Sequence, residues 1–92
     1  MKKLIIFFLE GCPYCRKAKD ALNELKAGDP DYEKADIEWI EETRFPELAD
    51  SYDYYHVPSI FCGDEKLYEC SPGDDYGEIR RQIGKALKTA AE

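Results

Sequence analysis

The chain has no excess of positive charge and no long hydrophobic run. Its 92 residues include 13 Lys+Arg against 20 Asp+Glu, for a formal net charge of −7, and no basic stripe is visible. A nucleic-acid partner is therefore not expected. The longest apolar run, residues 4–9, is far shorter than the ~20 residues of a membrane span. It is also shorter than the roughly 7–15 residues of the apolar region in a secretory signal peptide, and Glu10 interrupts it, so we expect neither feature.

Internal repeats, linkers and low-complexity tracts are absent too, and the length predicts one domain, residues 1–92, with one modest core. Aromatic residues are plentiful, with seven Tyr, four Phe and one Trp, which excludes a disordered acidic tail. The default expectation is a cytoplasmic protein. In that compartment, paired cysteines are catalytic or metal-binding more often than structural.

Local patterns predict an α/β fold in the order β-α-β-α-β-β-α. Residues 4–9 have the composition of a buried strand, and helical spacing of apolar residues follows from about 13 to 26, until Gly28-Asp29-Pro30 breaks it. Alternation from residue 33 to 39 predicts a second strand, joined to the first by a right-handed crossover. The other expected elements are a short helix at 45–49, strands at 57–62 and 66–69 around a turn at 63–64, and a last helix opened by an Asp75–Glu78 capping box. The first half would be parallel and the second antiparallel.

A Cys-x-x-Cys pair, Cys12-Pro13-Tyr14-Cys15, lies where the first strand is followed by the first helix. The first turn of a helix has unpaired N–H groups and a partial positive charge, which would stabilise a thiolate on Cys12. The thiolate is the reactive form of cysteine. Pro13 suits this turn because its missing N–H costs nothing there. The nearby charges that would modulate the thiolate are Arg16, Lys17 and Lys19, which favour it, and Glu10, which opposes it.

This arrangement predicts a redox dithiol. Cys12, exposed at the helix entrance, would attack a substrate disulfide, and Cys15, one turn later and more buried, would resolve the mixed disulfide. The alternative is half of a zinc site or a structural bridge. A zinc site would need two more ligands, and Cys62, Cys70 and His56 form no second tight pair. The strand-to-helix setting favours redox chemistry.

The other two cysteines are expected to be free thiols. In the predicted hairpin Cys62 faces about Glu65, and Cys70 lies five residues further along. At ~3.3 Å per residue that separation is about 16 Å, beyond the reach of a disulfide. Cys62 is expected to serve packing. Cys70 begins the loop before the last helix, where it would approach the active site, and a regulatory role for it is an open alternative to simple packing.

The segment before the third strand holds the only histidine, a tyrosine cluster and a proline. His56 has no carboxylate neighbour in an obvious motif, so we expect an exposed loop residue rather than a catalytic base. Tyr52, Tyr54 and Tyr55 are expected to be half-buried packing. Val57-Pro58 fits a loop entering a strand, since only about 5–6% of X–Pro bonds are cis. The alternative is a cis-proline beside the dithiol, with the Val57 backbone exposed to pair with a bound thiol or peptide.

Cys12-Pro13-Tyr14-Cys15 is the active-site sequence typical of dithiol glutaredoxins. With the later Val57-Pro58 before a hairpin and a closing helix, the chain resembles the glutaredoxin branch of the thioredoxin-like fold over nearly its whole length. The resemblance implies a four-stranded mixed sheet flanked by three helices, with a cis peptide before Pro58. It implies Cys12 as nucleophile and Cys15 as resolving thiol. The glutathione site that it implies is formed by Tyr14, the Val57 backbone, Pro58, and Asp74 or Asp75.

Two positions depart from the glutaredoxin pattern. Members commonly carry a Lys three residues before the first Cys, where it meets a glutathione carboxylate, and this chain has Leu9 there. They also usually have a Gly-Gly pair after the last strand, and here Cys70-Ser71-Pro72-Gly73 contains a single Gly. Lys17 or Arg16 would have to replace the missing carboxylate partner.

The sequence therefore indicates a monomeric thiol–disulfide oxidoreductase that reduces protein or low-molecular-weight, glutathione-type disulfides. We expect no permanently bound cofactor and no metal, with glutathione as co-substrate. One alternative is the same chemistry recharged by thioredoxin reductase, which Leu9 and the missing Gly-Gly motivate. Another is a non-catalytic iron–sulfur or metal carrier, with Cys12 ligating a cluster shared across a dimer. Pro13 argues against that carrier, since iron–sulfur members of the family tend to have a different residue there.

Overall fold

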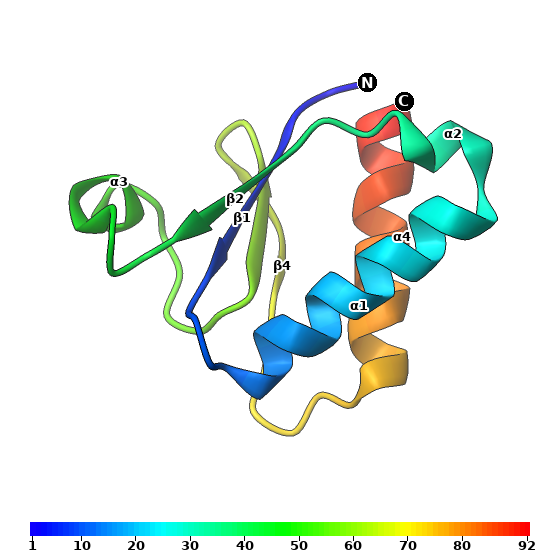
Figure 1. Cartoon of the computed structure of the whole chain (residues 1–92). Coiled ribbons are helices and arrows are strands. Elements are labelled where there is room, and N and C mark those ends of the chain that lie inside the picture. Colours follow the sequence, from blue (N-terminus) through cyan, green and yellow to red (C-terminus); the bar gives the residue numbers. More distant parts are fainter.

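A four-stranded mixed sheet forms the centre of the protein (Figure 1). The computed structural model describes all residues, 1–92. The strands are β1 (Leu4–Phe8), β2 (Ile37–Glu41), β3 (Ser59–Cys62) and β4 (Glu65–Glu69), in the spatial order β2-β1-β3-β4. β1 pairs with β2 in parallel and with β3 antiparallel, and β3 and β4 form an antiparallel hairpin. The expected parallel first half and antiparallel second half are confirmed.

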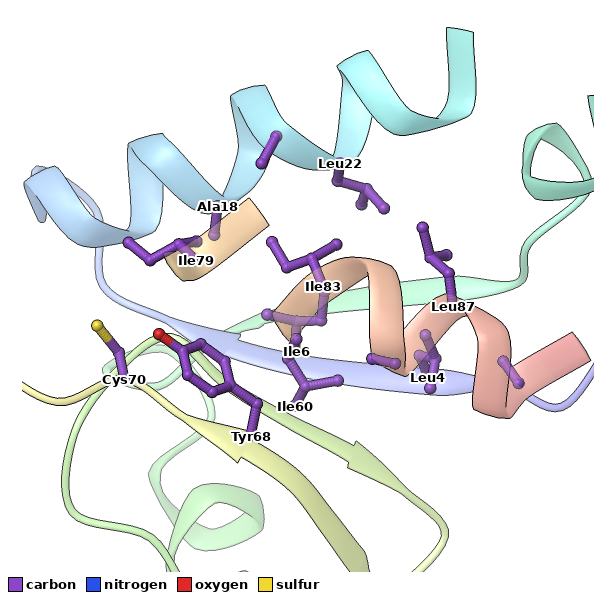
Figure 2. Close-up of a cluster of buried hydrophobic side chains, with 13 residues drawn as sticks. Leu4, Ile6, Ala18, Leu22, Ile60, Tyr68, Cys70, Ile79, Ile83 and Leu87 are labelled. Atoms are coloured by element: carbon purple, nitrogen blue, oxygen red, sulfur yellow. The ribbon is translucent and has the colours of Figure 1, made fainter. Parts of the chain in front are cut away.

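Helices cover both faces of this sheet. α1 (Pro13–Gly28) and α4 (Tyr76–Ala91) pack against each other on one face, and the short α3 (Pro46–Asp50) lies on the other (Figure 1). The larger core fills the space between the sheet and the helices α1 and α4, and Figure 2 shows it. α4 contributes the apolar stripe expected from its sequence, namely Ile79, Ile83, Ala86, Leu87 and Ala90.

β1 is apolar throughout because both of its faces are covered. Leu4 and Ile6 point into the core under α1 and α4 (Figure 2), whereas Phe7 points into a smaller cluster on the α3 side. That smaller cluster consists of Phe7, Ile40, Ala49 and Phe61. The strand that leads into the Cys-x-x-Cys motif is thus held from both sides.

The connection between α1 and β2 differs from the sequence expectation. A one-turn helix, α2 (Pro30–Glu33), ends at the first residue of the predicted second strand, and residues 34–36 are not in a strand either. The strand prediction was therefore wrong for residues 33–36. The side chain of Asp29 caps this turn by accepting the Asp31 N–H, and Pro30 fills the first helical position. β2 therefore begins at Ile37, and the three expected helices become four.

Two further boundaries also differ. β3 begins at Ser59 rather than at residue 57, so Val57 and Pro58 precede the strand. The capping box of α4 is half formed, because Asp75 accepts the Glu78 N–H at 2.8 Å while the Glu78 carboxylate binds Arg81 instead. No helix of the fold combines the length and the apolar character needed to cross a lipid bilayer.

The strand register brings several loops to one end of the sheet. Phe7 is paired with Ser59, and Ser59 with Glu69, so the segments after β1, before β3 and after β4 leave the sheet side by side. β2 ends there too, because Phe8 is level with Glu41. This end therefore carries the Cys-x-x-Cys motif, Val57-Pro58 and residues 70–75.

The two chain ends lie together at the opposite end of the sheet (Figure 1). The backbone N–H of Lys2 donates a hydrogen bond of 2.8 Å to the carbonyl of Ala90. This bond joins the residues before β1 to the last turn of α4.

Candidate active site

The Cys-x-x-Cys motif forms the start of α1. Cys12 is the N-cap and is half-buried, and Pro13 is the first helical residue. The Cys12 carbonyl accepts the first helical hydrogen bond from the Arg16 N–H at 3.0 Å, whereas the N–H groups of Tyr14 and Cys15 have no partner in the protein. These two free donors and the positive end of the helix favour an anion at the Cys12 sulfur.

Cys15 lies one turn further along and is 5% exposed. Burial raises the pKa of Cys15 to about 12, against a hydrogen bond of 3.5 Å that its sulfur accepts from the Leu9 N–H and with smaller contributions from Cys12 and Cys70. At neutral pH this thiol is protonated. The pair therefore consists of one accessible sulfur and one sheltered, protonated sulfur.

A tight turn leads from β1 into the motif. The Cys12 N–H donates to the Leu9 carbonyl at 3.2 Å, and Gly11 between them has a φ of +84°. Side chains disfavour that backbone conformation, which explains the glycine immediately before the first cysteine.

A buried carboxylate that sequence reasoning missed holds this turn in place. Glu41, at the end of β2, accepts a hydrogen bond from the Glu10 N–H at 3.2 Å, and the N–H and hydroxyl of Thr43 each donate to it at 2.6 Å. The Thr43 hydroxyl is the main reason that the pKa of Glu41 is lowered, against the effect of burial, and the Glu10 N–H adds to it. Glu41 thus ties the end of β2 to the residues before Cys12.

Tyr14 reaches across to the loop after β4. Its hydroxyl accepts a hydrogen bond from the Gly73 N–H at 2.9 Å, and the Lys17 ammonium lies 5.5 Å above its ring centre. The structure therefore brings Tyr14 and the Asp74 loop together, as the resemblance implies.

Asp74 and Asp75 both have internal partners. Asp74 Oδ2 accepts hydrogen bonds from the Tyr68 hydroxyl at 2.7 Å and from the Ser71 N–H at 3.0 Å. Burial, followed by the bond to Asp74, raises the pKa of Tyr68, which lies on the β4 side of the core (Figure 2). Asp75 Oδ1 caps α4. One carboxylate oxygen of each aspartate has no protein partner and is therefore available to a ligand.

Val57 and Pro58 lie in the segment just before β3. Their peptide bond is cis, as the resemblance implies. The Pro58 carbonyl accepts the Cys70 N–H at 3.0 Å, which fixes it to the end of β4. The backbone N–H and carbonyl of Val57 have no partner in the protein, so both can pair with a ligand.

Glu69, the last residue of β4, holds the loop before Val57. Its carboxylate accepts hydrogen bonds from the backbone N–H groups of Tyr55 at 3.0 Å and His56 at 2.8 Å. It also lies 3.2 Å from His56 Nδ1 and forms an ion pair with the Lys66 ammonium at 2.7 Å. Burial opposes ionisation, but these donors outweigh it and lower the pKa of Glu69 to about 2. His56 is exposed, as predicted, but the fold supplies the carboxylate neighbour that the sequence did not indicate.

The tyrosine cluster is only partly as expected. Tyr52 and Tyr54 are half-buried, each with its ring centre 4.9 Å from that of Phe7. Tyr55 is 88% exposed and has no aromatic partner, so the packing prediction was wrong for this residue.

All four cysteines are free thiols, which agrees with the sequence prediction for the second pair. Cys62 faces Glu65 in the hairpin, as expected. Cys70 is buried at the edge of the larger core (Figure 2), where burial raises its pKa against a hydrogen bond with Tyr68. No group of three or more His, Cys, Asp or Glu side chains is arranged to hold a metal ion.

A cleft of about 610 Å³ opens on one side of Cys12. Its apolar wall consists of Phe8, Leu9 and Trp39, and its charged lining consists of Glu10, Arg16, Lys17, Lys19 and Asp20. Tyr14, Val57 and residues 70–75 do not line it. The cleft is therefore separate from the groups that the resemblance assigns to glutathione.

Comparison with known proteins identifies the family. Residues 4–67 match the model of the Glutaredoxin family. The chain belongs to the glutaredoxin family. Glutaredoxin-1 of Oryctolagus cuniculus and glutaredoxin-1 of Bos taurus are each 26% identical to it over 76 residues, which cover 75% of this chain and 67% of theirs. Membership in the glutaredoxin family makes the chain a thiol–disulfide oxidoreductase in general terms.

Solved structures confirm the thioredoxin-like fold of this glutaredoxin-family member. The thioredoxin Deadhead of Drosophila melanogaster superposes with a TM-score of 0.60 at 19% identity, covering 90% of this chain and 78% of that one. Thioredoxin 1 of Thermosipho africanus superposes with a TM-score of 0.57 at 17% identity, covering 98% and 99%. At these identities the likeness shows the fold alone.

Proposed function

We propose that this glutaredoxin-family member reduces protein disulfides and glutathione-type mixed disulfides through Cys12 and Cys15. The observation that carries the proposal is the pairing of an accessible thiol at the N-cap of α1 with a buried thiol one turn later. The unpartnered N–H groups of Tyr14 and Cys15 support the role of Cys12 as the nucleophile, because they favour its thiolate.

The exchange would run in two steps. The Cys12 thiolate attacks one sulfur of the substrate disulfide, the S–S bond breaks, and the other sulfur leaves as a thiolate that takes up a proton. Cys15 then gives up its proton and its sulfur attacks that of Cys12, which releases the second substrate thiol. The substrate gains two electrons and two protons, and the protein is left with a Cys12–Cys15 disulfide. The pKa of about 12 for Cys15 supports this order, since its thiol stays protonated while Cys12 reacts.

Glutathione is the co-substrate that we propose for the return step. Two molecules would reduce the Cys12–Cys15 disulfide and leave as oxidised glutathione. The free N–H and carbonyl of Val57 support strand-like pairing with the tripeptide, next to Pro58 and Tyr14. The unpartnered carboxylate oxygen of Asp74, or that of Asp75, could receive its amino group. We propose no permanently bound cofactor.

Thioredoxin reductase is the second candidate for the reductant. Leu9 offers no cation to a glutathione carboxylate, and the loop that contains Gly73 has one glycine where relatives usually have two. We propose a monomer that acts on disulfide-containing proteins in the cytoplasm, where reducing conditions keep both thiols available.

One assay separates these possibilities. Reduction of a small mixed disulfide is followed with glutathione and glutathione reductase in one cuvette and with thioredoxin reductase in another, and Cys12→Ser is the blank for both. We expect turnover in the first cuvette. Turnover only in the second cuvette would mean that thioredoxin reductase, and not glutathione, is the reductant. No turnover in either cuvette would overturn the proposed function.

A further inference from the structure

Three cations beside Cys12 have no anionic partner. Arg16 is the only arginine without an ion pair, whereas Arg44, Arg80 and Arg81 are paired with Glu10, Glu24 and Glu78. Lys17 and Lys19 form no ion pair either. The chain as a whole has a net charge of −7, but the first two turns of α1, next to the Cys12 thiol, carry three unpaired positive charges.

These cations border the cleft whose apolar wall contains Phe8 and Trp39. The two rings meet edge to face, with centres 5.8 Å apart, and form a fixed aromatic surface. The Lys19 ammonium lies 5.6 Å from the centre of one ring and 5.4 Å from that of the other. The cleft thus has an apolar wall bordered by positively charged side chains, and Cys12 is part of its lining.

The acidic lining residues do not cancel this charge. Glu10 is already paired with Arg44, at 3.4 Å. Asp20 remains as one carboxylate against three cations and the positive end of α1. A ligand that matches this cleft would therefore combine a negatively charged group with apolar atoms.

We propose that this cleft binds an acidic segment of a disulfide-bearing protein, next to the cysteine that Cys12 attacks. A carboxylate of that segment would accept hydrogen bonds from Arg16 and Lys19, and a neighbouring apolar side chain would pack on Trp39. This inference rests on the proposed function and adds a substrate class to it. The lining of the cleft does not include Tyr14, Val57, Pro58, Asp74 or Asp75. It does include Arg16 and Lys17, the two residues expected to replace the missing partner of a glutathione carboxylate.

Two peptide disulfides test this proposal. Both carry one cysteine as a mixed disulfide with 2-thiopyridine and one leucine, and they differ only in having two aspartates or two lysines beside the cysteine. Attack by Cys12 on the peptide sulfur releases pyridine-2-thione, which is measured by its absorbance. Cys15→Ser is used so that the reaction stops at the mixed disulfide. Each rate is divided by the rate of the same peptide with 2-mercaptoethanol, which removes intrinsic differences in reactivity.

We expect the normalised rate to be about fivefold higher for the acidic peptide at low ionic strength, the size that one or two exposed ion pairs support. The preference should shrink at high salt, because exposed charges are screened. Adding Lys19→Gln to this background should lower the ratio, while Lys26→Gln, near the other end of the same helix, should keep it. A matched acidic peptide with Ser in place of Cys should change the emission of Trp39, the only tryptophan.

Equal normalised rates for the two peptides would overturn the docking proposal while leaving the proposed function intact. An equal loss of preference in Lys19→Gln and Lys26→Gln would also overturn it, because the effect would then come from net charge and not from the cleft. If neither peptide nor a small neutral disulfide reacted at all, the proposed function itself would fail.

Discussion

The carboxylate of Glu69 accepts a hydrogen bond of 2.8 Å from the backbone N–H of His56, two residues before Pro58. The N–H of the next residue along β4, Cys70, donates to the carbonyl of Pro58 itself. The end of β4 therefore fixes the chain on both sides of Val57, whose free backbone groups are the ones offered to a substrate. Glu69 is in this sense a positioning residue.

Glu69→Gln should weaken substrate binding more than it slows chemistry. The amide keeps one acceptor oxygen but loses the charge that receives Lys66 and the two backbone N–H groups, and hydrogen bonds to charged groups contribute about 1.5–3 kcal/mol. We expect KM for a glutathione mixed disulfide to rise several-fold with little change in kcat. The alkylation rate of Cys12 should stay at the wild-type value. A fall in kcat with unchanged KM would contradict the positioning role.

The stability of the protein should depend on Glu69 at acidic pH. Its pKa in the folded protein, about 2, lies below the ordinary value of 4.5, so the contribution is fully present above pH about 5 and disappears as the pH falls toward 2. The measurement is the urea midpoint of the wild type and of Glu69→Gln at several pH values. The difference between them should be constant from pH 5 to 7 and should narrow below pH 4. A difference that does not change down to pH 2 would show that the charge is not responsible.

Alkylation should distinguish the thiols in a fixed order. With iodoacetamide at pH 8, Cys12 should react first. Cys15 should react about a thousandfold more slowly than an ordinary exposed thiol, because burial holds its pKa near 12. Mass spectrometry of tryptic peptides over time gives the rates. Modification of Cys15 or Cys70 before Cys12 would reverse the assignment of the nucleophile.

Tyr14→Phe should loosen the loop after β4. The change removes the acceptor for the Gly73 N–H and should cost about 1 kcal/mol, the net contribution of one hydrogen bond. Hydrogen exchange of the Gly73 amide should become several-fold faster. Tyr76→Phe is the matched control, since it removes a tyrosine bond to Glu24 but leaves the Gly73 N–H with its acceptor. The same acceleration in both variants would mean that the Tyr14 contact is not what protects the loop.

Glu41→Gln should disturb the turn that carries Cys12. The carboxylate accepts hydrogen bonds from Glu10 and Thr43, and an amide cannot satisfy all of them. We expect a lower urea midpoint and a changed alkylation rate at Cys12. Glu38→Gln, on the same strand, removes only an exposed ion pair with Lys3 and should have little effect on either quantity. Indistinguishable results for the two variants would show that Glu41 does not hold the turn before Cys12.

Local sequence patterns were sufficient to predict most of the fold. The apolar run of β1, the helical spacing of α1 and the hairpin around residues 63–64 each depend on neighbours in sequence, and each formed as expected. The alternation at residues 33–39 was correct for residues 37–39 but misleading for residues 33–36, because a proline and a capping aspartate determine the turn of α2 just before them. The chemistry of the dithiol could be predicted from the sequence because two cysteines three residues apart are held close together by one helical turn.

The supporting contacts of the site could not be predicted in this way. Glu41 acts on a residue 31 positions away, and Tyr14 acts on one 59 positions away. Such pairs follow only from the strand register, which decides which loops share an end of the sheet. The cleft beside Cys12 has the same origin, because Trp39 reaches α1 only through the parallel pairing of β2 with β1.

The hydrogen bond between Lys2 and Ala90 has a practical consequence for handling the protein. It keeps the N- and C-terminal residues adjacent, at the far end of the sheet from Cys12. A short linker could therefore join the two ends, and new ends could be opened at the exposed turn of Gly63 and Asp64. For the same reason, a protein immobilised through a tag at either terminus would keep its thiol pair facing away from the support and accessible to a disulfide substrate.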